Sequence, residues 1–132
     1  MATKTINFYR VNEPYGSFSN FSPHPIYLLN KWWPTSEHYY QAQKFEDLHI
    51  QERIREAKTP REAAALGRDR SLPLRPDWET VKEDIMRAAL LAKFTQHTQL
   101  REELLATIGN TLVEHTKNDN YWGDGGDGRG LN

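Results

Sequence analysis

Hydrophobic residues at helical spacing after residue 77 restrict the fold of this chain more than any other feature. The apolar members of this run recur every three or four residues, as on the buried face of a helix: Trp78, Val81, Ile85, Ala88 and Ala92. Asp77 precedes the run at the position of a helix cap. The pattern predicts a long helix with one face in the core.

Four more helices are expected around this one, each with its own sequence signals. The first helix has a cap at Thr35 or Ser36 after Pro34 and ends near Phe45, and the second has an apolar stripe at Ile50, Ile54 and Ala57. The third begins with the capping box Thr59-Pro60-Arg61-Glu62 and has Gly67 at its C-terminal cap. The fourth starts at Thr98, with Leu100, Leu104 and Ile108 inside and Gly109 at its end. The middle of the chain is therefore helical.

Short strands and long polar loops flank the helices. The expected strands are Thr5 to Val11, a hairpin from Ile26 to Trp33 that turns at Asn30-Lys31, and Thr111 to Thr116. Residues 11–25 are rich in turn formers, and so long a loop inside a compact domain is usually functional. We expect an α+β fold, a helix-dominated single domain over residues 1–132 with a small β-sheet.

Composition excludes several classes of protein. The 132 residues contain no cysteine, which removes disulfides, thiolate metal sites and cysteine nucleophiles. The formal net charge of -1 argues against a non-specific coat for nucleic acid. No apolar run approaches the roughly 20 residues that span a bilayer, and the first residues lack the apolar stretch of a signal peptide. These features predict a small soluble protein of the cytoplasm that does not bind membranes.

One polar stripe lies on the helix expected after Pro34. At about 100° per residue, Glu37, Gln41 and Lys44 fall on one side of the helix and present an acid, an amide and an amine together. His38, Ala42 and Phe45 form a separate stripe that suits the core. The competing interpretation is a solvated face, with Glu37 placed in the first turn to complement the helix dipole.

A second candidate is the glycine-rich segment from Tyr121 to Gly130. Residues 123–128 satisfy G-x-G-x-x-G, but neither a following helix nor a βαβ unit supports a dinucleotide site. The bare backbone lets a ligand approach closely, with Trp122 available for stacking and Asp124 for hydrogen bonding. The competing interpretation is a disordered polar tail.

Arginines gather after Gly67, and their fixed guanidinium forks suit a phosphate. The arginines are Arg68, Arg70 and Arg75. A surface cluster paired with Asp69 and Glu62 is the competing interpretation. The five histidines show no metal-ligand spacing such as H-E-x-x-H, so we expect neither a metal site nor a cofactor.

Several segments, taken in order, resemble one family. They are Phe18-Ser19-Asn20-Phe21, Trp33 to Phe45, Gly67-Arg68, Trp78, Val81-Lys82, Met86, Lys93-Phe94 and Trp122-Gly123-Asp124-Gly125. On these residues the chain is similar to the YbiA-like, or NADAR, superfamily, whose fold it is then expected to share. The string EHYYQAQKF is the most specific part of the match.

The resemblance implies an N-glycoside hydrolase that cleaves a ribose C1′–N bond. Some members remove the ribosyl phosphate from early intermediates of riboflavin biosynthesis, and others remove ADP-ribose from modified guanine. The expected partner is a small N-riboside or an ADP-ribosyl group, and a nucleic acid enters only as the carrier of a modified base. The alternatives are a non-catalytic module that binds ADP-ribose or NAD, and an interaction protein whose glycine-rich end is ordered by a partner.

Within that activity, three residues are the candidate catalytic groups. Glu37 is expected nearest the anomeric carbon, where it either stabilises positive charge or activates water. Lys44 either holds a phosphate or ribose hydroxyl, or attacks C1′ and forms an imine with the ring-opened sugar. Asp124 is the second acidic candidate.

Eight further residues are expected to contact substrate. Asn20 would orient ribose hydroxyls, Trp78 or Trp122 would stack on a base, and Arg68 would meet phosphate. Phe21, Gln41, Gly67 and Gly123 complete the set. In related chains the glycine-rich loop leads into an amphipathic C-terminal helix, whereas this sequence stops at Gly130-Leu131-Asn132, so we expect a domain without that helix.

Overall fold

The computed structural model describes residues 3–132, which form two compact units. One unit is continuous and runs from Pro23 to Arg101. The other combines the N-terminal segment up to Ser22 with the C-terminal segment from Glu102. Each unit is described by itself.

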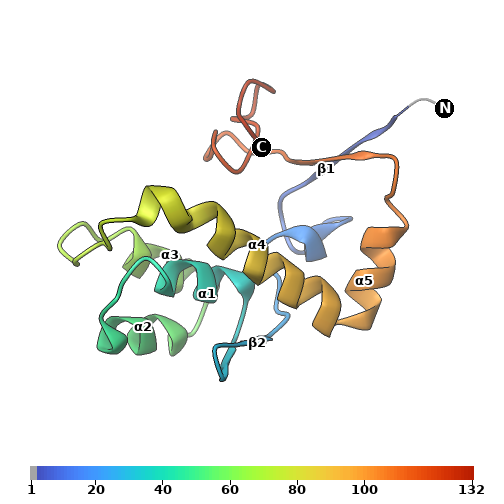
Figure 1. Ribbon diagram of the computed structural model, residues 1–132. Helices are drawn as coiled ribbons and strands as arrows, with labels where there is room; N and C mark the ends of the chain where they lie inside the picture. Colours follow the sequence, from blue (N-terminus) through green and yellow to red (C-terminus); the bar gives the residue numbers. More distant parts are fainter. Residues whose placement is uncertain (1–2) are drawn as a thin grey trace. The chain divides into compact units, whose positions relative to one another are not determined.

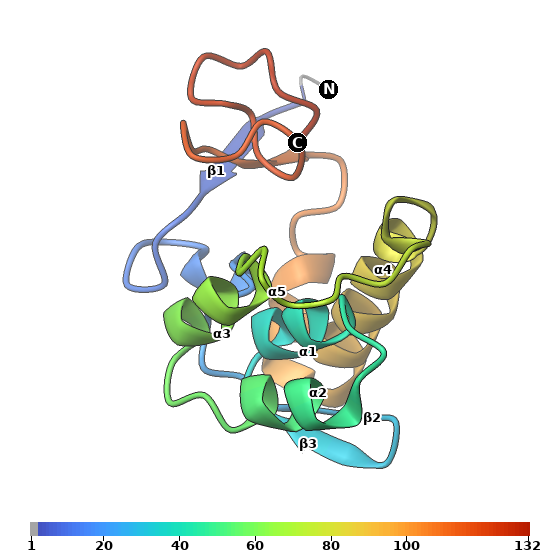
Figure 2. The same ribbon diagram turned by 90° about the vertical axis from the view of Figure 1, so that its left-hand side faces the viewer.

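Helix α1 is the central element of the continuous unit. The elements of this unit are β2 (Ile26–Leu28), β3 (Lys31–Trp33), α1 (Ser36–Ala42), α2 (Leu48–Arg55), α3 (Pro60–Gly67) and α4 (Trp78–Gln96). All seven residues of α1 are buried, and α1 contacts α2, α3 and α4 (Figure 2). The core around it consists of Ile26, Trp33, Tyr39, Ala42, Phe45, Ile54, Ala63, Ala89 and Ala92.

The discontinuous unit is built on a parallel strand pair from opposite ends of the chain. Strand β1 (Thr5–Phe8) pairs with β4 (Thr111–Glu114) over four residues (Figure 1). A 3₁₀ helix (Gly16–Phe18) places Phe18 edge-on against Phe8, with ring centroids 5.9 Å apart. Helix α5 (Thr98–Leu105) begins in the continuous unit and ends in this one.

These elements confirm the helix-dominated α+β class. Two of the expected caps are also confirmed, since Thr35 accepts a hydrogen bond from the His38 backbone and Thr59 accepts one from Glu62. The strands of the described residues form two separate two-stranded sheets, where the sequence suggested one. No helix within residues 3–132 is long and apolar enough to cross a membrane.

The hairpin turns one residue earlier than expected. Leu28 pairs with Lys31, so the turn residues are Leu29 and Asn30, and both have positive φ. This is the backbone of a type I′ turn, which matches the twist of the flanking strands. Asparagine adopts the left-handed conformation readily, whereas Leu29 adopts the same conformation at an energetic cost. Lys31 instead joins β3 and bonds Glu52 of α2 at 2.9 Å.

Two further predictions about helix ends are wrong, and a third is confirmed only in position. Helix α1 stops at Ala42 rather than near Phe45, so Lys44 lies just beyond it. Asp77 occupies the N-terminal cap position of α4, as predicted, but its side chain makes no cap bond and its carboxylate pairs with Arg75. Gly67 is the last residue of α3 rather than a cap with positive φ, and the cap position belongs to Arg68.

The interior position expected for Ile108 is also wrong. Helix α5 ends at Leu105, three residues earlier, and Ile108 is 77% exposed in the turns that follow. Gly109 has a φ of 91°, a conformation that glycine adopts without strain, and leads the chain into β4.

Candidate active site

A buried histidine fixes the beginning of α1. His38 is 1% exposed, and its ring nitrogens bond the Thr35 hydroxyl at 2.8 Å and the Ala57 carbonyl at 2.9 Å. Burial lowers the pKa of His38, so the ring is neutral at physiological pH. The bond to Thr35 lies within the start of α1, and the bond to Ala57 ties that turn to the segment after α2. His38 therefore has a structural role, as its place in the core stripe predicted.

Glu37 and Gln41 form a buried pair one turn apart on α1. They are 7% and 3% exposed, and the Gln41 Nε2 donates to the Glu37 Oε2 at 2.8 Å. The solvated-face interpretation of this stripe is wrong. A carboxylate with so little exposure is positioned by its neighbours rather than by water, as a reacting group requires.

Lys44 lies just past α1 with its amine near an aromatic pair. The Nζ atom is 5.8 Å from the ring centroids of both Tyr40 and Trp78, and those rings meet at an angle of 60° with centroids 5.1 Å apart. It also donates a long hydrogen bond of 3.5 Å to the Gly67 carbonyl. The side chain is thus held between α1, the end of α3 and the start of α4.

The surroundings of Lys44 lower the pKa of its amine. Burial lowers the pKa of Lys44 most, while the negative charge of Glu37 raises it and the positive charges of Arg68 and Lys82 lower it further; the net pKa lies below the ordinary value for lysine. The sequence-based hypothesis of a nucleophilic lysine required such a shift. A larger fraction of this amine is unprotonated near neutral pH than for a lysine in water.

Three of the predicted substrate contacts lie around the Lys44 amine, namely Gly67, Arg68 and Trp78. Gly67 packs directly against Gln41, and Arg68 is exposed at the end of α3. Trp78 is 6% exposed and packed on Tyr40, so its ring forms a wall of the site.

The described contacts of the arginine segment differ from the predicted pairing with Asp69 and Glu62. The Arg75 guanidinium pairs with Asp77 at 2.6 Å, and its backbone N–H donates to the Lys44 carbonyl at 2.8 Å. The Asp69 side chain accepts from the Ser71 N–H and hydroxyl, and Glu62 accepts from the Lys58 N–H. Arg75 therefore supports the segment that carries Lys44.

The remaining candidates belong to the discontinuous unit, where Asp124 organises the glycine-rich loop. Its carboxylate accepts from the Thr116 N–H at 3.0 Å and the Gly126 N–H at 2.9 Å, and it bonds the His115 Nδ1 at 2.7 Å. Gly123 is closely enclosed, because a Cβ there would lie 2.7 Å from the Asp119 carbonyl. The loop is thus held by its own hydrogen bonds, which contradicts the interpretation as a disordered tail.

The other three candidates of this unit lie on its loops. Trp122 is half-buried and meets Tyr121 edge-on, with ring centroids 4.8 Å apart. Asn20 is half-buried, and Phe21 is 38% exposed with its N–H bonded to the Ser19 hydroxyl. The structure therefore brings Glu37, Gln41, Lys44, Gly67, Arg68 and Trp78 together in one unit, and it places the other five candidates in the other.

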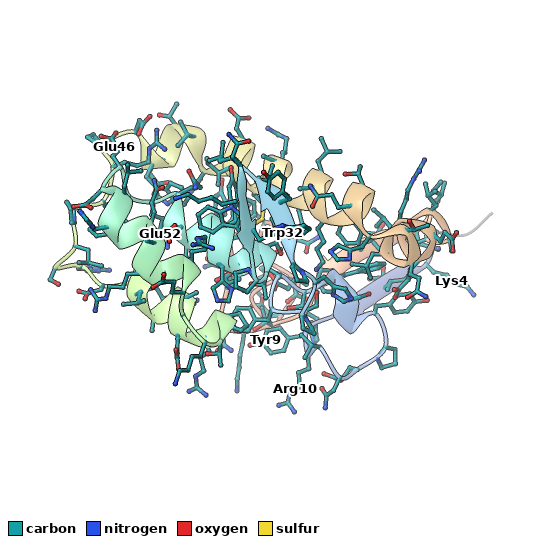
Figure 3. All side chains as sticks on the ribbon, turned by 90° about the horizontal axis from the view of Figure 1, so that it is seen from below. Lys4, Tyr9, Arg10, Trp32, Glu46 and Glu52 are labelled. Carbon is teal, nitrogen blue, oxygen red and sulfur yellow. The ribbon has the colours of Figure 1, made fainter. Side chains whose placement is uncertain are left out.

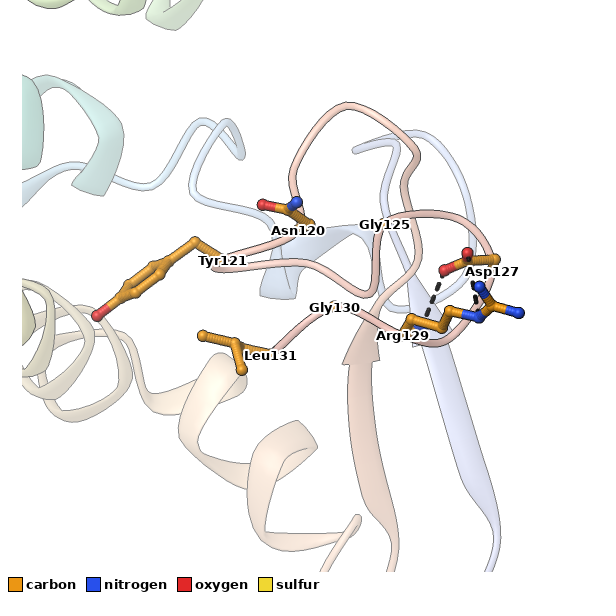
Figure 4. Close-up of a pocket in the computed structure, with 7 residues that line it drawn as sticks. All are labelled: Asn120, Tyr121, Gly125, Asp127, Arg129, Gly130 and Leu131. Carbon is orange, nitrogen blue, oxygen red and sulfur yellow. Dashed lines mark hydrogen bonds and ion pairs between the residues drawn. The ribbon is translucent and has the colours of Figure 1, made fainter.

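A hollow of about 420 Å³ lies in the discontinuous unit (Figure 4). It is lined by Asn120, Tyr121, Gly125, Asp127, Arg129, Gly130 and Leu131. Asp127 and Arg129 pair with one another at its rim, and Gly125 and Gly130 contribute bare backbone to its wall. Sequence reasoning anticipated the open backbone of this loop but not the hollow.

Sequence reasoning also missed two residues beside Lys44. Tyr40 supplies one of the rings over its amine, and Lys82 supplies a second positive charge. A signal for Lys82 existed, because it follows Trp78 by four residues and so lies on the same face of the helix. Among the described residues, no group of three histidine, aspartate or glutamate side chains is arranged to hold a metal ion.

The acid–base arrangement of Asp124 predicts a pH-dependent stability. The bond from His115, followed by the backbone bonds, lowers the pKa of Asp124 below its ordinary value of 3.8. A carboxylate with a lower pKa in the folded state stabilises the fold at higher pH, and loses this effect as the pH falls through the folded-state pKa. We expect Asp124→Asn to lower Tm at pH 7, and the difference from wild type to shrink below about pH 4.

Thermal unfolding followed by circular dichroism between pH 3 and pH 7 measures this difference. Asp127→Asn is the matched control, since Asp127 lies in the same loop and is 60% exposed. A difference in Tm between wild type and Asp124→Asn that stays constant down to pH 3 would contradict the stabilising role of the Asp124 carboxylate.

A family model described as the NADAR domain matches residues 7–132. The chain belongs to the NADAR domain family. N-glycosidase YbiA of Escherichia coli strain K12 is 58% identical over 132 residues, which make up all of this chain and 82% of YbiA. The NMR structure of E. coli YbiA matches with a TM-score of 0.90 over 98% of this chain and 77% of that chain. This likeness confirms the fold class and the resemblance of the sequence motifs.

Two other relatives are similar over nearly the whole of this chain. An N-glycosidase of Nostoc punctiforme is 53% identical over 131 residues, which cover 97% of this chain and 84% of the relative. A riboflavin biosynthesis protein of Vibrio vulnificus is 43% identical over 127 residues, which cover 96% of this chain and 35% of that larger protein.

Proposed function

We propose that this NADAR protein cleaves a ribose C1′–N bond with Glu37 and Lys44 as its reacting groups. The enzyme class, a hydrolase acting on N-glycosyl bonds, follows from the family and from relatives named N-glycosidases. One observation carries the residue assignment. A buried carboxylate, held by a hydrogen bond from Gln41, lies within electrostatic reach of an amine whose pKa is lowered.

Glu37 is proposed to act at the anomeric carbon. As the C1′–N bond breaks, the sugar becomes oxocarbenium-like, and a nearby carboxylate stabilises that positive charge. The same carboxylate can remove a proton from the attacking water. Its burial strengthens both effects, because charges interact more strongly where water is excluded.

Lys44 is proposed to act as a nucleophile. The neutral amine attacks C1′ as the bond to the base nitrogen breaks, and one proton of the resulting ammonium passes to the departing nitrogen. The C1′–O4′ bond then opens, the second proton passes to O4′, and an imine forms between Lys44 and C1′. Water hydrolyses this imine, which releases the sugar as an aldehyde and regenerates the amine. Support for this step comes from the lowered pKa of Lys44. A lysine that only held a phosphate would function better as a permanent cation.

Asp124 remains the second acidic candidate, with a supporting role. Its carboxylate already accepts two backbone N–H groups and bonds His115. We propose that it shapes the loop that presents Trp122 and Gly123.

The proposed substrate is a phosphoribosylamino-pyrimidine intermediate of riboflavin biosynthesis. Support comes from the name of the Vibrio vulnificus relative and from the net charge of -1, which gives no general attraction for nucleic acid. Arg68, exposed beside Lys44, is the proposed partner of the phosphate. ADP-ribosylated guanine is the second candidate, since it contains the same type of C1′–N bond.

Incubation with both substrates tests this function. The purified chain is mixed with a phosphoribosylamino-pyrimidine or with DNA that carries ADP-ribosylated guanine, and released base is measured by mass spectrometry. We expect base release from the pyrimidine riboside. Tight binding of either compound without release of base would contradict the proposal and support the non-catalytic module.

A further inference from the structure

The amide of Gln41 is held between Glu37 and Gly67. On one side its Nε2 donates to the Glu37 Oε2 at 2.8 Å. On the other side its Oε1 faces the Cα of Gly67, where a Cβ would lie only 1.9 Å from that oxygen. The side chain therefore connects the carboxylate on α1 to the last residue of α3.

Residue 67 is a glycine because a larger side chain has no room at this position. Its φ is not in the positive range, and the Arg68 N–H still bonds the Ala64 carbonyl at 3.0 Å, so the backbone is ordinary helix. An added Cβ would also lie 2.7 Å from the Cδ and 2.9 Å from the Cβ of Gln41. The Gln41 Cβ is fixed to the backbone of α1, so rotation of the side chain cannot remove every clash.

The orientation of the amide is set by Glu37. The Gln41 Oε1 is buried and has no hydrogen-bond partner among the described residues, which is costly for a polar atom. Rotating the amide by 180° would point this oxygen at the carboxylate and place two acceptors together. The observed orientation keeps the donor on Glu37 and leaves the acceptor unsatisfied.

We propose that Gln41 and Gly67 are positioning residues that act together to hold the Glu37 carboxylate in its reactive orientation. Gln41 supplies the hydrogen bond, and Gly67 supplies the space that the amide needs. The inference rests on the proposed role of Glu37. It gives Gly67 a steric function in place of direct contact with substrate.

Two variants remove this support in different ways. Gln41→Met keeps the length of the side chain but cannot donate to Glu37, and Gly67→Ala displaces the amide. We expect each to lower kcat about 10- to 100-fold, because small misplacements of a reacting group have effects of this size. Ala65→Ser, on the exposed side of α3, is the control and should retain wild-type kcat.

The pH profile of kcat/KM separates positioning from a general loss of structure. A hydrogen bond donated to a carboxylate stabilises its charged form, so losing it raises the carboxylate pKa. We expect the acidic limb of the profile to move up by about one pH unit in Gln41→Met. In a Gln41→Gly background, which removes all three clashing atoms, adding Gly67→Ala should change kcat little.

The inference is overturned if folded Gln41→Met keeps wild-type kcat and an unshifted acidic limb while Glu37→Gln is inactive. A rise in KM alone, with an unchanged profile, would also overturn it, since that result indicates direct substrate binding. Failure of Gly67→Ala to fold leaves the Gln41→Met result decisive. If Glu37→Gln itself retained activity, the proposed function would fail rather than this inference alone.

Discussion

Replacement of Glu37 by glutamine is expected to lower kcat about 1000-fold without unfolding the protein. Glutamine has the shape of glutamate, and its Oε1 can still accept the hydrogen bond from Gln41. The substitution removes the negative charge and the proton acceptor and keeps this hydrogen bond. Base release followed by mass spectrometry gives kcat, and thermal unfolding of the same sample reports the fold.

Glu46→Gln is the matched control for this prediction. Glu46 is an exposed glutamate close to Lys44 in the chain (Figure 3), so its variant makes the same chemical change at an exposed position. We expect wild-type kcat for it. Near-wild-type turnover by a folded Glu37→Gln variant would contradict the carboxylate mechanism, whatever the control shows.

Borohydride added during turnover is expected to attach the sugar permanently to Lys44. Borohydride reduces an imine to a stable amine, so a trapped adduct requires the covalent step. The lowered pKa of Lys44 increases the fraction of its amine that is unprotonated near neutral pH. The mass of the intact protein should rise by that of the reduced sugar, and peptide mapping should place the adduct at residue 44.

Two variants define the specificity of the trapping experiment. Lys44→Arg keeps the positive charge but cannot form an imine, so we expect no adduct and a loss in kcat of about 100-fold or more. Lys58→Arg changes an exposed lysine of the same unit and should trap normally. An adduct mapped to Lys82 would move the nucleophile to α4. No adduct, with activity retained in Lys44→Arg, would leave lysine 44 as a phosphate ligand only.

Local sequence signals predicted the beginnings of helices and the pairing of site residues on one helix. Thr35 and Thr59 act as expected because a cap depends on residues within one turn. The four-residue spacing of Glu37 and Gln41 likewise gives their contact. The Asp77 side chain does not accept the cap hydrogen bond, because Arg75, two residues earlier, pairs with its carboxylate.

The spacing of residues along the sequence did not predict which side chains are buried or which distant segments pack together. A polar stripe on a helix is expected to face solvent when the packing of other helices is unknown. In the structure, α2, α3 and α4 cover α1. The reason for glycine at residue 67 lies in Gln41, 26 residues earlier, and no local pattern shows that contact. The pKa of Lys44 depends in the same way on Arg68 and Lys82, which are far from it in the sequence.

The pairing of β1 with β4 sets an order for folding during synthesis. Thr5 leaves the ribosome more than a hundred residues before its partner Thr111, so the first strand waits unpaired while the intervening chain is made. The helices and hairpin between Pro23 and Arg101 contact one another within a continuous segment and need no such delay. Contacts between nearby residues also form faster than distant ones. The glycine-rich loop, anchored after β4, therefore takes its shape later than the helices and hairpin between Pro23 and Arg101.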